Sequence, residues 1–353
     1  MNSLFQPLQQ RGLSLRNRIV VSPMCQYSSV DGMPDDWHLV HLGSRAVGGA
    51  AVVFTEASAV SPEGRISPQD AGIWSDAQAE AWTRIAAFIA SQGAIPAMQL
   101  AHAGRKASTF APWRGSGEVP RAAGGWQAVA PSALAFGEGY PLPLALDADG
   151  IAKVVADYRA AALRAHAAGF RIVEIHAAHG YLLHEFLSPL SNRRDDAYGG
   201  SFDGPTRLLR ETVAAVRDAW PAELPLWLRI SATDWVDGGW DVEQSVELAR
   251  IVAPLGVDLV DVSSGGLDPR QRIATGPGYQ VPFAARIRRE AGVATGAVGL
   301  ITEAGQAEAI VAGGGADVVL LARELLRDPY FPRRAARALG VEPEAPEQYL
   351  RAW

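Results

Sequence analysis

The chain has 353 residues, of which 48% are hydrophobic and 20% charged, which is typical of a globular protein and not of a disordered one. Its 38 acidic residues exceed its 32 basic ones, and the formal net charge of −6 argues against general nucleic-acid binding and against a polybasic membrane patch. A single cysteine excludes an internal disulfide and a multi-cysteine iron–sulfur site. We find no signal peptide and no apolar run of about 20 residues, so we expect a cytoplasmic protein without a membrane span.

Short β-branched segments alternate with longer alanine-rich amphipathic segments. The predicted strands are 18–24, 51–56, 95–100, 171–176, 226–231, 259–263, 293–298 and 317–322. The predicted helices are 37–47, 76–92, 149–168, 205–219, 242–253, 281–290, 303–312 and 325–339. This alternation predicts a parallel (β/α)8 TIM barrel that forms one domain over residues 1–353. The alternative is an open doubly wound sheet, which is disfavoured because the chain has no G-x-G-x-x-G fingerprint and no lysine placed for a P-loop.

One segment interrupts the alternation. Residues 106–147, after the third predicted strand, are rich in glycine and proline and include four aromatic residues: Trp113, Trp126, Phe136 and Tyr140. A long irregular loop at the carboxyl end of a barrel strand is commonly part of the active-site wall. We therefore expect this loop to cap the active site.

Polar side chains gather at the carboxyl ends of the predicted strands, the face at which barrel enzymes hold their sites. The segments concerned are Ser22–Tyr27, Glu56–Ser58, Gln99–Arg105, His176–Tyr181, Arg229, Ser263–Gly266, Gly296–Gly299 and Arg323. If the strands are as predicted, all of these segments converge on one mouth, and a functional site is the favoured interpretation.

The two histidines of this set, His176 and His179, allow two interpretations. A helical turn after the strand would place both imidazoles on one side, where they could bind a metal or donate hydrogen bonds to a carbonyl or phenolate oxygen. His38 and His41 have the same spacing within a predicted helix, so the spacing alone is weak.

Two further residues stand out by position. Arg323 follows the eighth predicted strand, and the glycine-rich segments Gly296–Gly299 and Gly313–Gly315 flank the seventh and eighth, which is the usual phosphate position in this fold. Cys25 follows the first strand, where either a buried core residue or a reactive thiol is possible.

Together these motifs resemble the Old Yellow Enzyme family. The matching segments are Ser22–Cys25, Gln99–Lys106, His176–Pro189, Asp196–Ser201, Thr295–Gly299 and Arg323–Pro329. Cys25 with Tyr27, and the C-terminal Arg351-Ala-Trp353, resemble the bacterial thermophilic-like branch that includes xenobiotic reductases. The resemblance implies a barrel that carries non-covalent FMN, is reduced by NADPH or NADH, and reduces the activated C=C bonds of enones, maleimides and other α,β-unsaturated carbonyl compounds, with nitro compounds as a further class.

The resemblance also implies which residues bind the flavin: Ser22, Pro23, Met24, Cys25, Ala57, Gln99, Arg229, Ala322 and Arg323. Arg229 would lie beside N1 and the C2 oxygen, where a guanidinium stabilises the anionic reduced ring. Arg323 and the backbone of Ala322 would hold the phosphate, although the family commonly has glycine in place of Ala322. The thiol of Cys25 would lie near the N5/O4 edge.

On the substrate side, the resemblance implies that His176 and His179 hydrogen-bond the substrate's carbonyl oxygen. Hydride would pass from flavin N5 to the β-carbon, Tyr181 would donate a proton to the α-carbon, and Tyr27 would help to position the oxygen. Gln26 stands at a position that is often apolar, and Lys106 follows the family pattern without a role that we can assign.

The C-terminal tail, residues 341–353, contains two prolines and so cannot continue a helix. The resemblance implies that it reaches a neighbouring subunit and places Arg351 and Trp353 at that subunit's active site. We therefore expect a homodimer, or a tetramer built as a dimer of dimers.

Two other functions fit parts of this pattern. A metal-dependent hydrolase would use His176, His179 and a carboxylate such as Glu174 or Asp261, but it leaves Cys25, Gln99, Arg229 and Arg323 without a role. A barrel that only binds a phosphate ligand has no specific support. We therefore expect no metal site.

Overall fold

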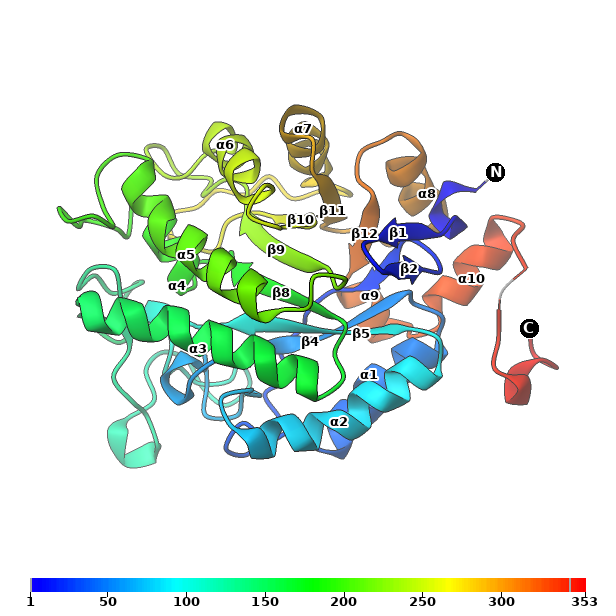
Figure 1. Ribbon diagram of the computed structural model, residues 1–353, viewed down its shortest axis with the longest axis horizontal. Coiled ribbons are helices and arrows are strands. Elements are labelled where there is room, and N and C mark those ends of the chain that lie inside the picture. Colours follow the sequence, from blue (N-terminus) through cyan, green and yellow to red (C-terminus); the bar gives the residue numbers. More distant parts are fainter. Residues whose placement is uncertain (1, 343) are drawn as a thin grey trace.

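Eight parallel strands close into a barrel in this computed structural model, which describes residues 2–342 and 344–353 (Figure 1). Around the barrel they are β3 (Ile19–Val21), β4 (Val52–Ala59), β5 (Ile95–Ala101), β8 (Ile172–Ala177), β9 (Leu226–Ser231), β10 (Leu259–Ser263), β11 (Ala294–Val298) and β12 (Val318–Leu321), and β12 pairs with β3. The expected TIM barrel is confirmed, with each predicted strand in its place.

Helices surround the barrel. They are α1 (Asp36–Val47), α2 (Asp76–Ser91), α3 (Ala148–Ala167), α4 (Leu182–Leu187), α5 (Asp203–Ala219), α6 (Val242–Val252), α7 (Val281–Ala291), α8 (Ala304–Ala312), α9 (Arg323–Arg327) and α10 (Phe331–Ala338). Short 3-10 turns occur at Ser3–Phe5, Pro62–Gly64, Gly104–Lys106, Arg121–Ala123 and Glu347–Tyr349. Within the described residues, no helix combines the length and the apolar character that a membrane crossing requires.

The helices of the structure differ from the predicted ones in two places. The predicted helix 325–339 is divided into α9 and α10 because Pro329 lacks an N–H group and disfavours a helical conformation at Asp328. The short helix α4, directly after the turn that carries His179 and Tyr181, was not predicted.

An N-terminal hairpin, β1 (Leu8–Gln10) and β2 (Leu13–Leu15), covers the amino end of the barrel. Gln10 Oε1 accepts a hydrogen bond of 2.7 Å from Trp227 Nε1, and Trp227 packs on Phe54 with ring centroids 5.4 Å apart. Large apolar side chains therefore fill this end of the barrel, and the polar side chains lie at the other.

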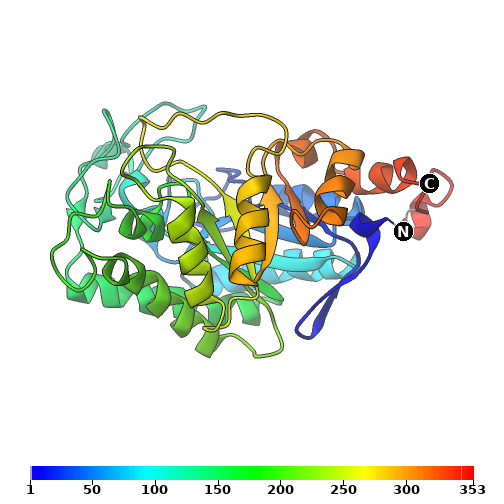
Figure 2. The same ribbon diagram turned by 90° about the horizontal axis from the view of Figure 1, so that it is seen from above.

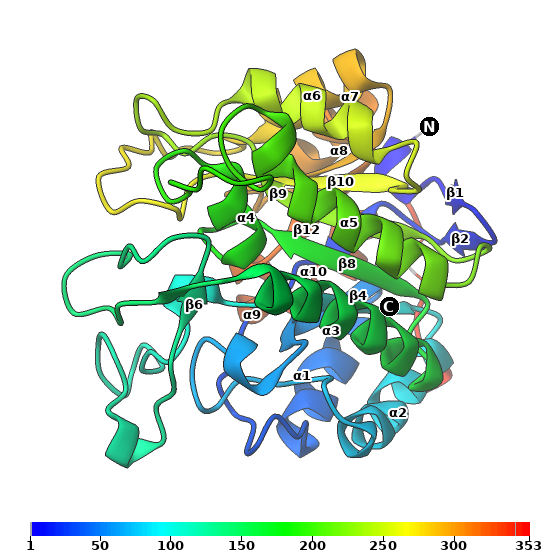
Figure 3. The same cartoon turned by 60° about the vertical axis from the view of Figure 1, so that its left-hand side comes forward.

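The loop 106–147 extends from the carboxyl ends of the strands, at the left of Figure 1, and comes forward in Figure 3. It contains the short strands β6 (Val129–Ala130) and β7 (Leu144–Ala145), which pair with each other. Trp126 Nε1 donates to the carbonyl of Glu63 at 2.8 Å, and Trp113 packs edge-on against Tyr27 at 5.5 Å. Both chain termini lie at the opposite end of the barrel (Figures 1 and 2).

Candidate active site

Strand register brings the predicted site residues into neighbouring positions at the carboxyl end of the barrel. Ala57 of β4 pairs with Gln99 of β5, and Gln99 pairs with Glu174 of β8. One step further along, His176 of β8 pairs with Arg229 of β9. Ser22–Tyr27 follow directly on β3 and reach the same end.

The guanidinium of Arg229 is buried, but only some of its N–H groups have a partner. Its Nη2 donates to Ser22 Oγ at 3.1 Å, and its Nε lies 3.0 Å from Asp261 Oδ2. Its Nη1 has no hydrogen bond to any residue that the structure describes. A fixed positive charge with a free donor therefore remains next to Ser22, as a flavin N1 and C2 oxygen would require.

Two carboxyl groups lie beneath this site. Glu174 Oε1 accepts from Gln99 Nε2 at 2.7 Å, and burial, together with the charge of Asp261, raises the pKa of Glu174 to about 8. Burial raises the pKa of Asp261 to about 6 against the opposing effect of Arg229. These carboxyl groups face Gln99 and Arg229, and residues 2–342 and 344–353 contain no group of three or more His, Cys, Asp or Glu side chains arranged to hold a metal ion.

His176 and His179 meet as expected, but not on a helix. His176 belongs to β8, and His179 lies in the following turn with a left-handed φ of +59°. Their ring centroids are 5.2 Å apart and the rings are almost perpendicular. The expected helical turn is therefore wrong, because the strand ends at Ala177 and a tight turn through Gly180 follows.

Both imidazoles are held neutral. Burial and the nearby charge of Arg229 lower the pKa of each far below its ordinary value. The backbone N–H of Ala178 donates to His176 Nδ1 at 3.3 Å, which leaves the ring proton of His176 on Nε2 as a free donor. His179 Nε2 lies 2.7 Å from Ser263 Oγ.

Tyr181 lies edge-on against His176, with ring centroids 5.1 Å apart. Burial raises its pKa well above the ordinary value, and nearby Cys25 and Tyr27 act in the same direction. The phenol therefore stays protonated at neutral pH and is available as an acid.

Cys25 and Tyr27 pack with Tyr181 against a small apolar cluster under the loop. Burial and the charges of Asp70 and Glu56 raise the pKa of the Cys25 thiol well above its ordinary value. The side chain is therefore a thiol and not a thiolate, which disfavours a nucleophilic role.

A cavity of about 200 Å³ lies at the ends of β11 and β12. Its lining includes Gly299, Ala322 and Arg323. The side chain of Arg323 is exposed and forms no hydrogen bond or ion pair with any described residue. Its side chain is therefore free to meet an anion of phosphate size.

Lys106 has a role that sequence reasoning missed. Its Nζ donates to the carbonyl oxygens of His179 at 2.8 Å and Gly266 at 3.0 Å, and it lies 5.0 Å from the ring centroid of Tyr181. Burial lowers its pKa to about 8. The signals in the sequence were its place directly after the polar end of the third strand and its match to the family pattern, and neither indicated this role.

The structure does not bring Arg351 and Trp353 to this chain's own site. Trp353 stacks on Tyr330 with ring centroids 6.3 Å apart, and Arg337 donates to the Trp353 carbonyl at 2.7 Å. The tail therefore lies along α10, at the end of the barrel that carries both termini (Figure 1).

Known proteins share this barrel. The NADH:flavin oxidoreductase / NADH oxidase family matches residues 3–342. An NADPH dehydrogenase of Geobacillus thermodenitrificans is 49% identical over 352 residues, covering 99% of this chain and 98% of that protein. An NADPH dehydrogenase of Bacillus subtilis is 46% identical, covering 99% of both chains.

Two solved structures have a similar fold. Morphinone reductase in complex with tetrahydroNAD has a TM-score of 0.78 and 30% identity, covering 98% of this chain and 92% of that one. An old yellow enzyme homologue from Zymomonas mobilis has a TM-score of 0.79 and 27% identity, covering 98% and 96%. The chain therefore belongs to the NADH:flavin oxidoreductase family, the Old Yellow Enzymes, and is an oxidoreductase.

Proposed function

We propose that the protein is an FMN-dependent ene-reductase that uses NADPH or NADH to reduce activated C=C bonds of α,β-unsaturated carbonyl compounds. The observation that carries this proposal is the arrangement of two neutral imidazoles and a protonated phenol beside a buried arginine at one mouth. His176, His179 and Tyr181 are the donors, and Arg229 is the arginine. Such a site stabilises negative charge on an oxygen and delivers a proton nearby.

The residues present fit FMN. The free Nη1 of Arg229 suits the electron-rich N1 and C2 oxygen. Ala57 and Gln99 pair in register, and Ser22, whose Oγ accepts from Arg229, follows β3 directly, so all three are placed for the polar rim. Pro23 and Met24 would cover the ring, and the Cys25 thiol would lie at its N5/O4 edge and tune its electronics.

The phosphate end also fits. The side chain of Arg323 forms no hydrogen bond or ion pair with a described residue and lines a cavity of about 200 Å³. Ala322, whose backbone N–H precedes Arg323 in the chain, lines the same cavity. One phosphate site without a dinucleotide fingerprint favours FMN over FAD.

On the substrate side, His176 donates its Nε2–H to the carbonyl oxygen and draws charge from the alkene. His179 is the second donor, and Ser263 Oγ, 2.7 Å from its Nε2, is placed to select its tautomer. When bound, reduced FMN supplies the hydride that the β-carbon receives. Tyr181 gives its phenolic proton to the α-carbon, and Tyr27 helps to position the oxygen.

The assembly is part of the proposal. Because the tail lies at the end of the barrel opposite its own mouth, Arg351 and Trp353 can serve an active site only in another subunit. We propose a homodimer or a dimer of dimers in which these residues complete the partner's site. Arginine and tryptophan are enriched at the centres of protein interfaces.

The test starts with the purified protein. Mass spectrometry of the released cofactor should show FMN, and anaerobic reduction by NADPH or NADH followed by addition of enones or maleimides should reoxidise it. Replacing both His176 and His179 with alanine should keep the flavin bound but slow alkene reduction by on the order of 10²-fold. FAD, no flavin after reconstitution, or stoichiometric zinc lost in the double variant would overturn the proposal.

A further inference from the structure

The turn that carries His179 and Tyr181 has its backbone polar groups satisfied by side chains from other elements. The N–H of His179 donates to Ser231 Oγ at 2.9 Å, and its carbonyl accepts from Lys106. The N–H of Gly180 donates to Nδ1 of His184 at 2.9 Å. A side-chain framework therefore sets the conformation of this turn, and His184 holds its central residue.

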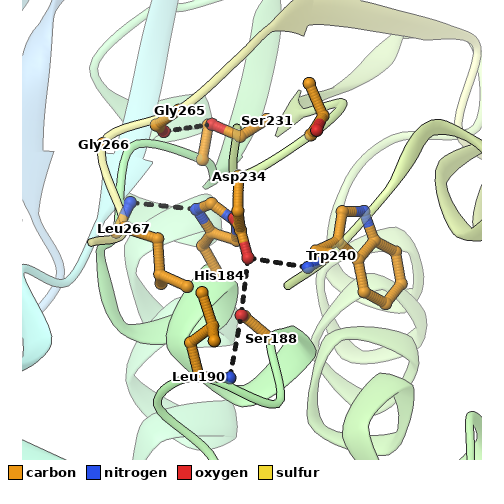
Figure 4. Close-up of polar contacts among 12 residues, drawn as sticks. His184, Ser188, Leu190, Ser231, Asp234, Trp240, Gly265, Gly266 and Leu267 are labelled. Atoms are coloured by element: carbon orange, nitrogen blue, oxygen red, sulfur yellow. Dashed lines mark hydrogen bonds and ion pairs between the residues drawn. The ribbon is translucent and has the colours of Figure 1, made fainter. Parts of the chain in front are cut away.

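His184 is in turn held by a carboxylate. Its Nε2 lies 2.9 Å from Asp234 Oδ1, and both side chains are completely buried. Asp234 Oδ2 accepts from Ser188 Oγ at 2.6 Å and from the backbone N–H of Trp240 at 2.7 Å, as Figure 4 shows. Burial would raise the pKa of Asp234, but the neighbouring His184, with the Ser188 and Trp240 donors, outweighs it and holds that pKa below its ordinary value.

This arrangement admits one tautomer of His184. Because Gly180 N–H points at Nδ1, that nitrogen must be unprotonated, and the ring proton must be on Nε2. The Asp234 carboxylate only accepts hydrogen bonds, so it favours the same tautomer. In Asp234→Asn, the amide NH2 group is a hydrogen-bond donor. It would face either the imidazole Nε2–H or the Trp240 N–H, so two donors would oppose each other.

The turn also has little freedom to relax. A Cβ at Gly180 would lie 2.2 Å from the carbonyl oxygen of Gly266, and a Cβ at Gly266 would lie 2.6 Å from the Cα of His179. The two backbones are therefore in direct contact, and a change at Gly180 must be transmitted to His179 or Tyr181.

We propose that His184 and Asp234 are positioning residues for the alkene-reducing site: Asp234 selects the tautomer of His184, and His184 holds Gly180 so that His179 and Tyr181 face the substrate. The proposal rests on the proposed function of that site. Neither residue touches the substrate, because both are buried behind the turn.

Three variants separate this role from a general structural one. In His184→Asn the amide oxygen replaces Nδ1 and can still accept from Gly180, whereas in His184→Gln the amide replaces Nε2 and only the contact with Asp234 survives. We expect His184→Asn to retain kcat/KM for an enone within about threefold, and His184→Gln and Asp234→Asn to lose on the order of 10- to 100-fold, as misplaced catalytic groups do. The control is His166→Gln, at an exposed histidine on α3, which should change nothing.

Two further measurements do not depend on turnover. Binding of 4-hydroxybenzaldehyde, followed by the flavin absorbance, should weaken about tenfold in His184→Gln and Asp234→Asn with the flavin fully bound. Long-range 1H–15N spectra of the wild-type protein should show His184 as the Nε2–H tautomer.

The outcomes are distinct. A His184 that carries its proton on Nδ1, or unchanged kcat/KM and phenol binding in His184→Gln and Asp234→Asn, would overturn the positioning role. Equal losses in His184→Asn and His184→Gln, in parallel with lowered melting temperatures, would also overturn it. If the wild type shows the Nε2–H tautomer but reduces no enone, the proposed function fails while the support of the turn stands.

Discussion

Replacing Gly180 with alanine tests whether the turn between the two catalytic side chains tolerates any displacement. Gly180 has a φ of +71°, and an L-residue pays about 1–2 kcal/mol in this left-handed region. Its new methyl would also lie 2.2 Å from the Gly266 carbonyl oxygen and 2.8 Å from the Leu267 Cα. Relieving that contact requires a backbone shift, which costs about 1–3 kcal/mol in addition.

The expected destabilisation of Gly180→Ala is therefore about 2–5 kcal/mol. With 353 residues and about 2.1 cal/mol/K of unfolding entropy per residue, this lowers the melting temperature by about 3–7 °C. Because His179 and Tyr181 move with the turn, kcat/KM for an enone should fall on the order of 10²-fold.

The matched control for this variant is Gly292→Ala. Gly292 ends α7 with a φ of +70°, and a Cβ there would meet no atom within 4 Å. Gly292→Ala therefore carries only the free-energy cost of placing alanine in the left-handed region. It should lower the melting temperature by about 1–3 °C without changing activity. Equal stability losses in the two variants, or a Gly180→Ala enzyme with wild-type kinetics, would refute the packing argument.

Three further predictions concern the site itself. Tyr181→Phe should slow alkene reduction of poor substrates and leave flavin reduction by NADPH little changed; an unchanged alkene half-reaction across a substrate panel would rule out Tyr181 as the proton donor. Cys25→Ala should remain active with a shifted flavin reduction potential, whereas abolished turnover at an unchanged potential would contradict the tuning role. Since the pKa values of His176 and His179 are lowered, both rings stay neutral well below their ordinary titration range and should contribute no titration to alkene reduction. The pH profile between pH 6 and pH 8 should therefore keep its shape in His176→Asn and His179→Asn, because Asp261, Glu174 and Lys106 are the groups that titrate in this range; a sigmoidal loss centred near pH 6.5 that disappears in either variant would show that one of the imidazoles titrates normally.

The barrel could be predicted because its signal is local and repeated. Most of the buried parallel strands are short apolar runs rich in β-branched residues, and most of the segments between them carry a longer amphipathic helix. The convergence of the polar segments followed from topology alone, since the carboxyl ends of parallel strands share one face. That is why Gln99, His176 and Arg229 could be assigned to one site before their distances were known.

The remaining features depend on contacts that no local pattern encodes. His184 and Asp234 are 50 positions apart and meet only because α4 packs behind the end of β9. The two carbonyl groups bound by Lys106 belong to separate loops, so its role was also invisible. The spacing of His176 and His179 was misinterpreted as helical because a spacing of three residues fits both a helical turn and a strand followed by a tight turn.

The C-terminal tail offers the sharpest test of assembly. Tyr349 and Leu350 are 41% and 60% exposed, and Arg351 is also exposed, so much of the apolar surface of the tail is left uncovered by its own barrel. Trp353 stacks on Tyr330, and the guanidinium of Arg337 on α10 lies 5.2 Å from the centroid of its ring. A second subunit that accepts this segment would bury it and receive a cation at its mouth.

Deleting Gln348–Trp353 should therefore raise KM for small enones and weaken self-association, while the barrel keeps its flavin. Arg351→Ala should raise KM with little effect on self-association, because it removes the charge but leaves the apolar contacts. Light scattering and steady-state kinetics on both variants separate the two contributions. If the truncated enzyme keeps both its mass in solution and its kinetics, the tail has no role in a partner's site, and the active site is complete within one barrel.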